Sequence, residues 1–271
     1  MQETGNNHIQ SLSLSVRLHA DGFSFFCYAP SNSAEVKVED YAYSATESKA
    51  DTLMKAVGES ALIKGRDLAM VFALVTTPSM CMPLECFRKE EAPRLLRLTY
   101  SDVGVCKTYY NILPHVEVAQ IFGVDTEIER RIRLQFPDVR VYHSLTMVLE
   151  KMWLLERQGQ RRLNVFFNEK DFFAFSFNGG ALLYANTFPA DAPENAAYFI
   201  LSVWKDLEMN VHDDTCVLFG DGTMKADTGH LLMKYLRNVK DMKADDIYRR
   251  PLHAEAAHIP FDVQALLANI S

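Results

Sequence analysis

The chain has 271 residues, a length that accommodates two domains of about 130 residues each. It is 48% hydrophobic and 23% charged, which is typical of a globular protein with a packed core. A net charge of −7 disfavours non-specific nucleic-acid binding, and no stretch approaches the ~18 apolar residues of a membrane-spanning helix.

The N-terminal segment and the cysteines both bear on the cellular compartment. Residues 1–10 are polar and lack the apolar core of a signal peptide, so we expect a cytoplasmic protein. The five cysteines are odd in number and show no framework spacing, which favours reduced thiols. Cys81 and Cys86 are spaced like half a metal site, but no second pair follows, and buried small side chains are the simpler role.

The first part of the chain predicts an open sheet that begins with antiparallel strands. Alternating apolar and polar residues predict a half-buried strand, and a continuous apolar run predicts a strand covered on both faces. Asp21 and Gly22 can form the tight turn between the first two strands. Ser44 and Glu47 have the spacing of a capping box, which predicts the start of a helix. The expected strands are residues 12–18, 23–28, 36–43 and 69–75.

The middle of the chain is interrupted by prolines. A charged segment at residues 88–91 predicts a short helix, and two strands are expected at 106–112 and 116–122. Thr126 and Glu129 form a second capping box. The helix that follows carries three arginines, which form either a solvated face or an anion-binding patch. These arginines are Arg130, Arg131 and Arg133.

The pattern of the first part returns in the second part. Ser144 is the expected N-cap of a helix, and Asn178 with Gly179 gives a strong hairpin signal. Asp227 is expected to cap a later helix, and a last helix starts near Pro260. The expected strands are residues 139–142, 163–167, 172–177, 181–188 and 215–219.

Two copies of three strands, a helix, a strand and a helix resemble the duplicated ribonuclease-H-like unit of the actin, sugar-kinase and heat-shock-chaperone superfamily. The run from Leu12 to Phe25 is also similar to an uncharacterised bacterial family assigned to that superfamily. Within it, the actin-like proteins of pilus assembly and cell division resemble this layout most. The resemblance implies an α/β fold with mixed sheets and a two-domain actin-like architecture, divided into residues 1–138 and 139–271.

The resemblance also implies ATP and Mg²⁺ between the two halves, held by a glycine-containing turn in each. In that superfamily the first hairpin carries Asp-x-Gly-Ser/Thr, whose Asp organises Mg²⁺. Here Arg17 or His19 would occupy the position of that carboxylate. Asp21 and Gly22 lie further out, where they form either an ordinary turn or a displaced phosphate loop.

The second hairpin and the adenosine loop also depart from the nucleotide-binding pattern of the superfamily or fit it weakly. The turn at residues 168–171 reads Asn-Glu-Lys-Asp, without the glycine of the superfamily, and its two carboxylates would repel phosphates. Gly220 and Gly222 follow an apolar strand and belong either to a plain strand-to-helix turn or to a remnant nucleotide pocket. We assign no catalytic residue and no metal ligand. The candidates for a vestigial nucleotide cleft are Asp21, Asp171, Gly220 and Gly222.

Two further groups of polar residues could carry chemistry. His253, Glu255 and His258 are not spaced like His-Glu-x-x-His, because the histidines are five residues apart and would not share a helix face. A polar loop or an exposed helix is expected. Asp213 and Asp214 precede a strand and form either a carboxylate pair or, more simply, a solvated turn.

Phenylalanines crowd both faces of the predicted hairpins. Core packing accounts for one face of each hairpin, and the other must be covered by a helix, by the partner domain or by another protein. These residues are Phe23, Phe25, Phe26, Phe166, Phe167, Phe172, Phe173, Phe175 and Phe177.

The first hypothesis is a cytoplasmic, non-catalytic actin-like scaffold or protein-binding module with a degenerate nucleotide site and no cofactor. It would bind an unknown protein partner and no nucleic acid. The alternative is a divergent Mg-ATP-dependent ATPase or small-molecule kinase. That enzyme would use Asp21 or Asp171 for Mg²⁺ and residues 220–222 beneath the adenine.

Overall fold

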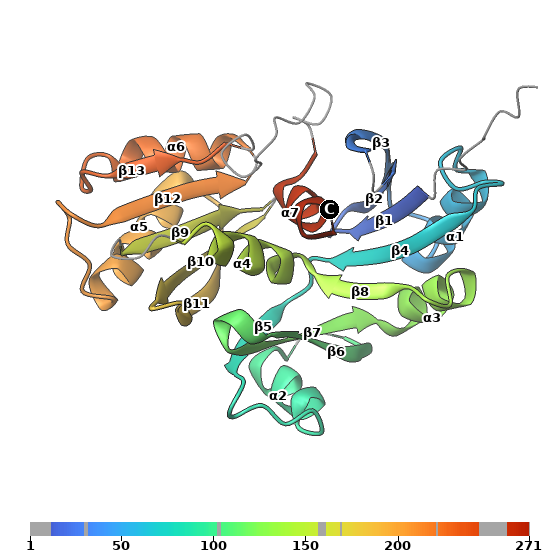
Figure 1. Cartoon of the computed structure of the whole chain (residues 1–271), viewed down its shortest axis with the longest axis horizontal. Helices are drawn as coiled ribbons and strands as arrows, with labels where there is room; N and C mark the ends of the chain where they lie inside the picture. Colours follow the sequence, from blue (N-terminus) through green and yellow to red (C-terminus); the bar gives the residue numbers. More distant parts are fainter. Residues whose placement is uncertain are drawn as a thin grey trace, which may run out of the picture.

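The computed structural model describes residues 12–29, 32–101, 104–156, 161–168, 170–220, 222–243 and 259–270. These residues form two lobes that lie side by side, with a smaller sheet attached to the first lobe (Figure 1). None of the described helices is long and apolar enough to cross a membrane.

The first lobe is built on a five-stranded sheet in the order β3-β2-β1-β4-β8. β1, β2 and β3 are antiparallel neighbours, while β4 runs parallel to β1 and β8 parallel to β4. β1 alternates as predicted, so that Leu14 and Val16 share one core while Ser13 and Ser15 lie on the other face. The strands are β1 (Leu12–Leu18), β2 (Gly22–Ala29), β3 (Asn32–Ala42), β4 (Leu68–Val75) and β8 (Arg140–His143).

The second lobe repeats this sheet in the order β11-β10-β9-β12-β13, with the same strand directions. Gly179 and Gly180 both have positive φ and form the two-residue turn between β10 and β11. The duplicated ribonuclease-H-like architecture with mixed sheets is therefore confirmed. The strands are β9 (Arg162–Phe167), β10 (Asp171–Asn178), β11 (Ala181–Pro189), β12 (Thr215–Gly220) and β13 (Val239–Asp241).

β8 belongs to the sheet of the first lobe, since residues 140–143 pair in parallel with residues 72–75 of β4. The expected division between residues 138 and 139 placed this strand in the second half. That division stays a prediction, and the pairing of β8 favours a boundary that follows His143.

A third sheet is inserted between β4 and β8. It is antiparallel, in the order β5-β7-β6, and is packed against α2 (Ala92–Thr99). The helix predicted at residues 88–91 is wrong, because α2 begins at Ala92 with Pro93 in its first turn, where a missing N–H costs nothing. The strands are β5 (Ser79–Pro83), β6 (Cys106–Leu113) and β7 (Val118–Asp125), with the short 3₁₀ helix Pro114–Val116 between the last two.

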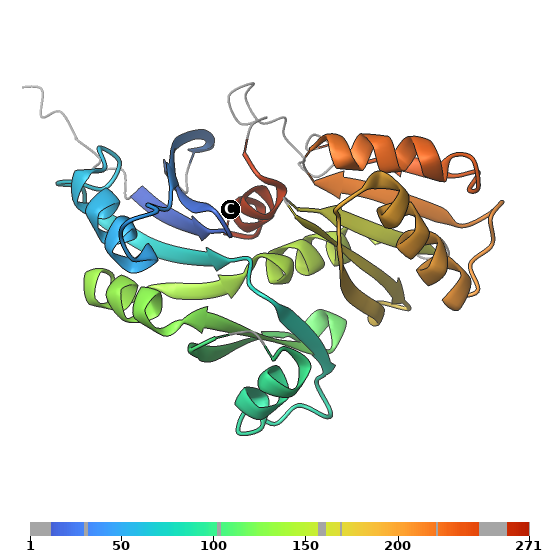
Figure 2. The same cartoon turned by 180° about the vertical axis from the view of Figure 1, so that it is seen from behind.

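Each main sheet is covered on one face by a pair of helices, α1 with α3 on the first sheet and α5 with α6 on the second. A third pair, α4 with α7, lies between the lobes (Figures 1 and 2). α1 and α3 share a core with β1 and β2, and α5 and α6 share a core with β9 and β12. The helices are α1 (Lys49–Glu59), α3 (Thr126–Gln135), α4 (Ser144–Leu154), α5 (Pro193–Asp206), α6 (Thr223–Leu232) and α7 (Phe261–Ile270).

Apart from the helix expected at residues 88–91, the predicted helices are present, but the predicted caps lie one to five residues from the observed ones. Ser44 accepts bonds from the amides of Thr46 and Glu47 in a turn before α1, and does not cap the helix. Asp227 lies inside α6 instead of at its start. The observed N-caps are Ser48 for α1, Asp125 for α3, His143 for α4 and Gly222 for α6.

The helix that follows the last strand of each main sheet covers the sheet of the other lobe. α4 follows the first sheet and packs Val148 and Leu149 against Phe173 and Phe175 of the second. α7 follows the second sheet and packs against the first, where Leu266 and Phe26 share a core. The second aromatic face of the hairpins is therefore covered within the chain.

Candidate functional site

Arg17 joins three distant segments between the two lobes. Its Nε donates to both carboxylate oxygens of Asp262, at 3.1 and 2.9 Å, and its guanidinium also donates to Asn168 Oδ1 at 3.2 Å. Arg17 is the last residue but one of β1, Asn168 lies in the turn after β9, and Asp262 is in the first turn of α7. Arg17 is 5% exposed and Asp262 is fully buried, so each charge depends on the other for solvation.

The two hairpin turns also contact each other directly. Lys170 Nζ lies 2.7 Å from Asp21 Oδ2, and both side chains are exposed. Asp21 is one of the candidate nucleotide-site residues, and the structure places it against the side chain of the opposite turn. Because the pair is in water, it adds little to stability.

Asp171 opens β10 at the second turn. Its carbonyl oxygen accepts from Asn168 N at 2.9 Å, which closes the hairpin, and in register it faces Pro189 of β11. The residue also lines the cavity between the lobes. Glu169 lies outside the described residues.

Gly220 and Gly222 are required by the chain turn from β12 into α6. Gly220 has φ of +92°, and a Cβ there would lie 2.1 Å from Phe167 O of the neighbouring β9. Gly222 has φ of +100° with open space around it, and it caps α6 without a side-chain hydrogen bond. The turn accounts for both glycines, while the uncapped start of α6 leaves backbone amides that an anion could reach.

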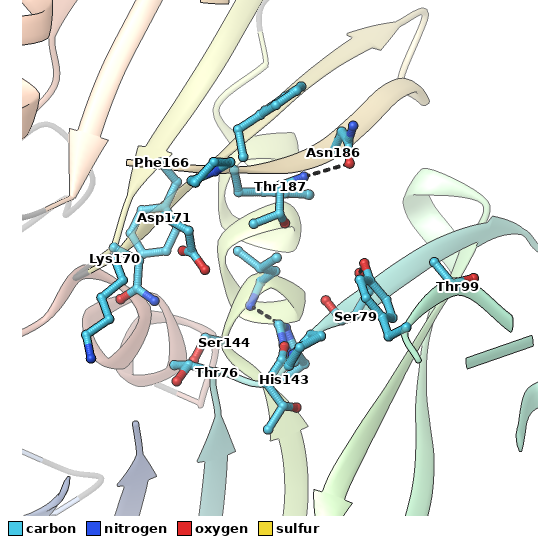
Figure 3. Close-up of a pocket in the computed structure, with 18 residues that line it drawn as sticks. Thr76, Ser79, Thr99, His143, Ser144, Phe166, Lys170, Asp171, Asn186 and Thr187 are labelled. Carbon is cyan, nitrogen blue, oxygen red and sulfur yellow. Dashed lines mark hydrogen bonds between the residues drawn. The ribbon is translucent and has the colours of Figure 1, made fainter. Parts of the chain in front are cut away.

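A cavity of about 520 Å³ lies in the cleft between the lobes, beside the second hairpin (Figure 3). His143, Ser144 and Thr76 lie on one side at the start of α4, and Lys170, Asp171 and Asn186 lie across from them. Asp21, Gly220 and Gly222 do not line it. Its remaining walls come from residues 77–79, 99–100, 145, 166, 168, 173 and 187–189.

His143 connects this cavity to the inserted sheet. Its Nδ1 accepts from Leu145 N at 3.2 Å, so Nε2 carries the proton and donates to Thr77 O at 2.7 Å. Gln120 of β7 donates to the same Nδ1 at 3.1 Å, and the Thr146 hydroxyl lies 3.0 Å from Gln120 Oε1. Burial lowers the pKa of His143 to about 4, so the imidazole is neutral near pH 7.

The three arginines of α3 are each paired with carboxylates. Arg131 lies 3.0 Å from Asp51 of α1, and Arg130 and Arg131 both reach Glu127. Arg133 lies 2.7 Å from Glu129. These ion pairs favour the solvated face over an anion-binding patch.

Glu129 is the buried member of this group. Its burial raises the carboxyl pKa, but hydrogen bonds from Lys107, Tyr109 and Arg133 outweigh that effect and lower the pKa to about 2.

The other candidates for chemistry are not brought together. Asp214 accepts from the amide of Asn210 at 2.7 Å within a turn. Burial raises the pKa of the Cys81 thiol to about 12, and Cys86 is exposed. Within the described ranges, no three His, Cys, Asp or Glu side chains are grouped as metal ligands. The sequence 253–258 lies outside those ranges.

Sequence reasoning missed the partners that make this region. Asp262 follows Pro260 at the start of a predicted helix, which is a visible signal, but nothing in the sequence connects it with Arg17. Ser79 and Tyr100 of the cavity come from the inserted unit, whose strand β5 was not predicted.

The fold is shared with solved structures. A protein with actin-like ATPase fold and unknown function from Bacteroides thetaiotaomicron VPI-5482 is 27% identical, covers 96% of each chain and has a TM-score of 0.81. The PilM–PilN type IV pilus biogenesis complex is 12% identical, covers 97% of this chain and 98% of that chain, and has a TM-score of 0.56. A search of curated protein sequences finds no match.

These structures confirm the resemblance to actin-like proteins, including those of pilus assembly. Residues 2–239 match the model of a family described as a protein of unknown function, DUF3822. The chain therefore belongs to the DUF3822 family and has an actin-like ATPase fold.

Proposed function

We propose that this chain is an actin-like protein-binding module that does not hydrolyse ATP. The observation that carries the proposal is the buried contact of Arg17 with Asp262 and Asn168 between the two hairpin turns. In the superfamily that the chain resembles, a carboxylate for Mg²⁺ would stand near Arg17. An arginine there repels Mg²⁺, and its charge is already paired within the protein.

The second turn supports the same conclusion. A phosphate needs backbone amides at close range, which glycine allows, but residues 168 and 170 carry side chains that contact Arg17 and Asp21. The residues at the turns therefore fit Mg-ATP poorly, and we derive no catalytic step through it.

We place the partner surface on the inserted unit. Leu98 of α2 is 73% exposed, and Tyr110 and Ile112 are exposed on β6, which is an edge strand of its sheet. α2 packs beside β6, so these apolar side chains lie on neighbouring elements. An edge strand next to exposed apolar groups can accept an extended segment of another protein. PilM in its complex with PilN is the structural precedent for a partner on this fold.

We place the protein in the cytoplasm, since all five cysteines are free thiols.

Thermal denaturation with and without millimolar Mg-ATP tests the first half of the proposal. A ligand at 100 times its Kd adds about 2.7 kcal/mol to the free energy of unfolding, which is easily seen as a rise in Tm. We expect no rise. A clear rise that Asp171→Ala abolishes would establish nucleotide binding and contradict the proposal.

Affinity capture from native lysate, with mass spectrometry, tests the second half. The double variant Leu98→Glu with Ile112→Lys should lose the captured partner while keeping the Tm of the unmodified chain. Leu183→Glu is the matched control, because Leu183 is 50% exposed on an edge strand of the other lobe. Equal loss in both variants would contradict the assigned surface.

One observation favours the alternative of a divergent ATPase or kinase. Gly222 caps α6 without a side-chain bond, so the first turn of α6 could receive a phosphate in the manner of an adenosine loop. Hydrolysis of Mg-ATP that Gly222→Val removes would decide for this enzyme.

A further inference from the structure

Ser144 holds a buried hydroxyl that the protein itself does not satisfy. The residue is 2% exposed, and among the described residues no hydrogen-bond partner reaches its Oγ. It is the first residue of α4, a helix of 11 residues, and it lines the cavity between the lobes. An orphaned buried hydroxyl is costly, so its presence at a cavity wall points to a ligand that completes it.

The same wall carries the positive end of a helix. α4 begins at the cavity, and the partial charge at a helix N-terminus favours a negative group. His143 caps the helix through Nδ1 and stays neutral, so it adds no second full charge. The helix and the hydroxyl therefore favour the same kind of ligand atom, an oxygen that accepts hydrogen bonds.

Further donors surround the cavity. Ser79 Oγ accepts from Gln120 Nε2 at 3.1 Å, and no acceptor for its own proton is found in the described part of the chain. Asn168 Oδ1 accepts from Arg17, which leaves the Asn168 amide NH₂ as the group that can face a ligand. Lys170 Nζ has three donors and uses one direction for Asp21, so it can hold a ligand oxygen as well.

The charges of the lining favour a singly charged ligand over a dianion. Of the described residues that line the cavity, Lys170 is the cation and Asp171 the anion. These two charges cancel, and Lys170 is also paired with Asp21, so the helix terminus supplies the remaining partial positive charge. A single carboxylate therefore meets less repulsion from Asp171 than a phosphate dianion would.

Aromatic side chains form another part of the cavity wall and suit an organic body. Phe166, Phe173 and Phe188 line it from the second lobe, and Tyr100 lines it from the inserted unit. A volume of about 520 Å³ is in the range of small-molecule sites.

From these observations we propose that the interlobe cavity binds a monocarboxylate with an aromatic or aliphatic body. The carboxylate lies at the start of α4 against Ser144 Oγ, with Lys170 at the mouth, and the body packs against Phe166 and Phe173. This goes beyond the protein-binding role proposed above. The two proposals can fail separately, since Mg-ATP tests the proposed protein-binding role and uncharged analogues test the carboxylate site.

Isothermal titration calorimetry of the full chain with phenylpropionate and its amide tests the site. We expect one molecule bound per chain and affinity for the amide at least about tenfold weaker, because it lacks the charge that strengthens each hydrogen bond. Phenyl phosphate should bind more weakly than phenylpropionate. N-acetylphenylalanine presents its carboxylate as a peptide C-terminus does. Its affinity relative to phenylpropionate shows whether the site prefers a peptide C-terminus or a free small acid.

Variants locate the binding in this cavity. Ser144→Ala should weaken phenylpropionate about three- to tenfold, and it should leave Tm unchanged or raised because it removes an unpaired buried hydroxyl. Lys170→Gln, a change at an exposed residue, should weaken it similarly, and Lys234→Gln outside the cavity should not. Equal affinities for acid and amide, no binding by any of the acids, tighter phenyl phosphate, or full affinity in Ser144→Ala would each overturn the proposal.

Discussion

Replacing Asp262 by asparagine should lower the free energy of unfolding by about 3–5 kcal/mol, because the buried Arg17 guanidinium then loses the carboxylate that its Nε contacts. Nε of Arg17 lies 3.1 and 2.9 Å from the two carboxylate oxygens. Arg17 is 5% exposed and Asp262 is fully buried, so water cannot replace the lost contact. The asparagine carbonyl still accepts one bond, which places the expected loss toward the lower end of the range.

Urea unfolding followed by circular dichroism measures this loss, with Asp21→Asn as the matched control. Asp21 makes an ion pair of 2.7 Å with Lys170, but the two side chains are 69% and 63% exposed. Removing its charge should leave the free energy of unfolding nearly unchanged. The Arg17–Asp262 and Lys170–Asp21 pairs have similar N–O distances, so a difference between the two variants reports the effect of burial on stability.

A double variant completes the test. Arg17→Met combined with Asp262→Leu removes both buried charges and keeps the volume, so it should recover most of the loss in Asp262→Asn. Equal losses for Asp262→Asn and Asp21→Asn would refute the reasoning. A double variant no more stable than Asp262→Asn alone would refute it as well.

Three other predictions concern stability. His143 has a folded pKa of about 4 against an ordinary 6.5, so its contribution to the free energy of unfolding is complete above pH 6.5 and is lost as pH falls toward 4. Urea unfolding should show a loss of about 2 kcal/mol between pH 6.5 and 4.5, and His143→Gln should reduce that loss. Glu129 has a folded pKa of about 2 against an ordinary 4.5, so its contribution to the free energy of unfolding is present above pH 4.5 and lost as pH falls toward 2. Glu129→Gln should flatten the dependence of unfolding on pH in that window, and an unchanged dependence would contradict the lowered pKa of Glu129. Gly220→Ala should cost about 1–3 kcal/mol through positive φ and the contact with Phe167 O, whereas Gly58→Ala, with open space inside α1, should be neutral or stabilising by calorimetric Tm.

The elements of both lobes could be predicted because each carries its own local signal. β1 alternates, β4 is a continuous apolar run, and Gly179 allows the turn after β10. The capping residues could not be predicted as well, since several hydroxyl and carboxylate residues stand near each helix start. Asp125 caps α3 through bonds to two amides, although Thr126 fits the capping-box spacing.

The inserted unit shows where local patterns lose their value. β5 is short and intermediate in burial, so its residues Ser79–Pro83 lack a clear period of two. The strand exists because it pairs with β7, about forty residues later in the chain, an arrangement that depends on tertiary contacts.

The sequence by itself determined the repeated succession of strands and helices along the chain and the residues at each hairpin turn, because hydrophobic periodicity and turn residues act over short stretches of the chain. The tertiary structure alone decided that Arg17 contacts Asp262 and that Ser144 faces a cavity. It also decided that α4 covers the sheet of the second lobe and α7 the sheet of the first. Those contacts join segments far apart in the chain, and their energies depend on burial, which no local pattern specifies.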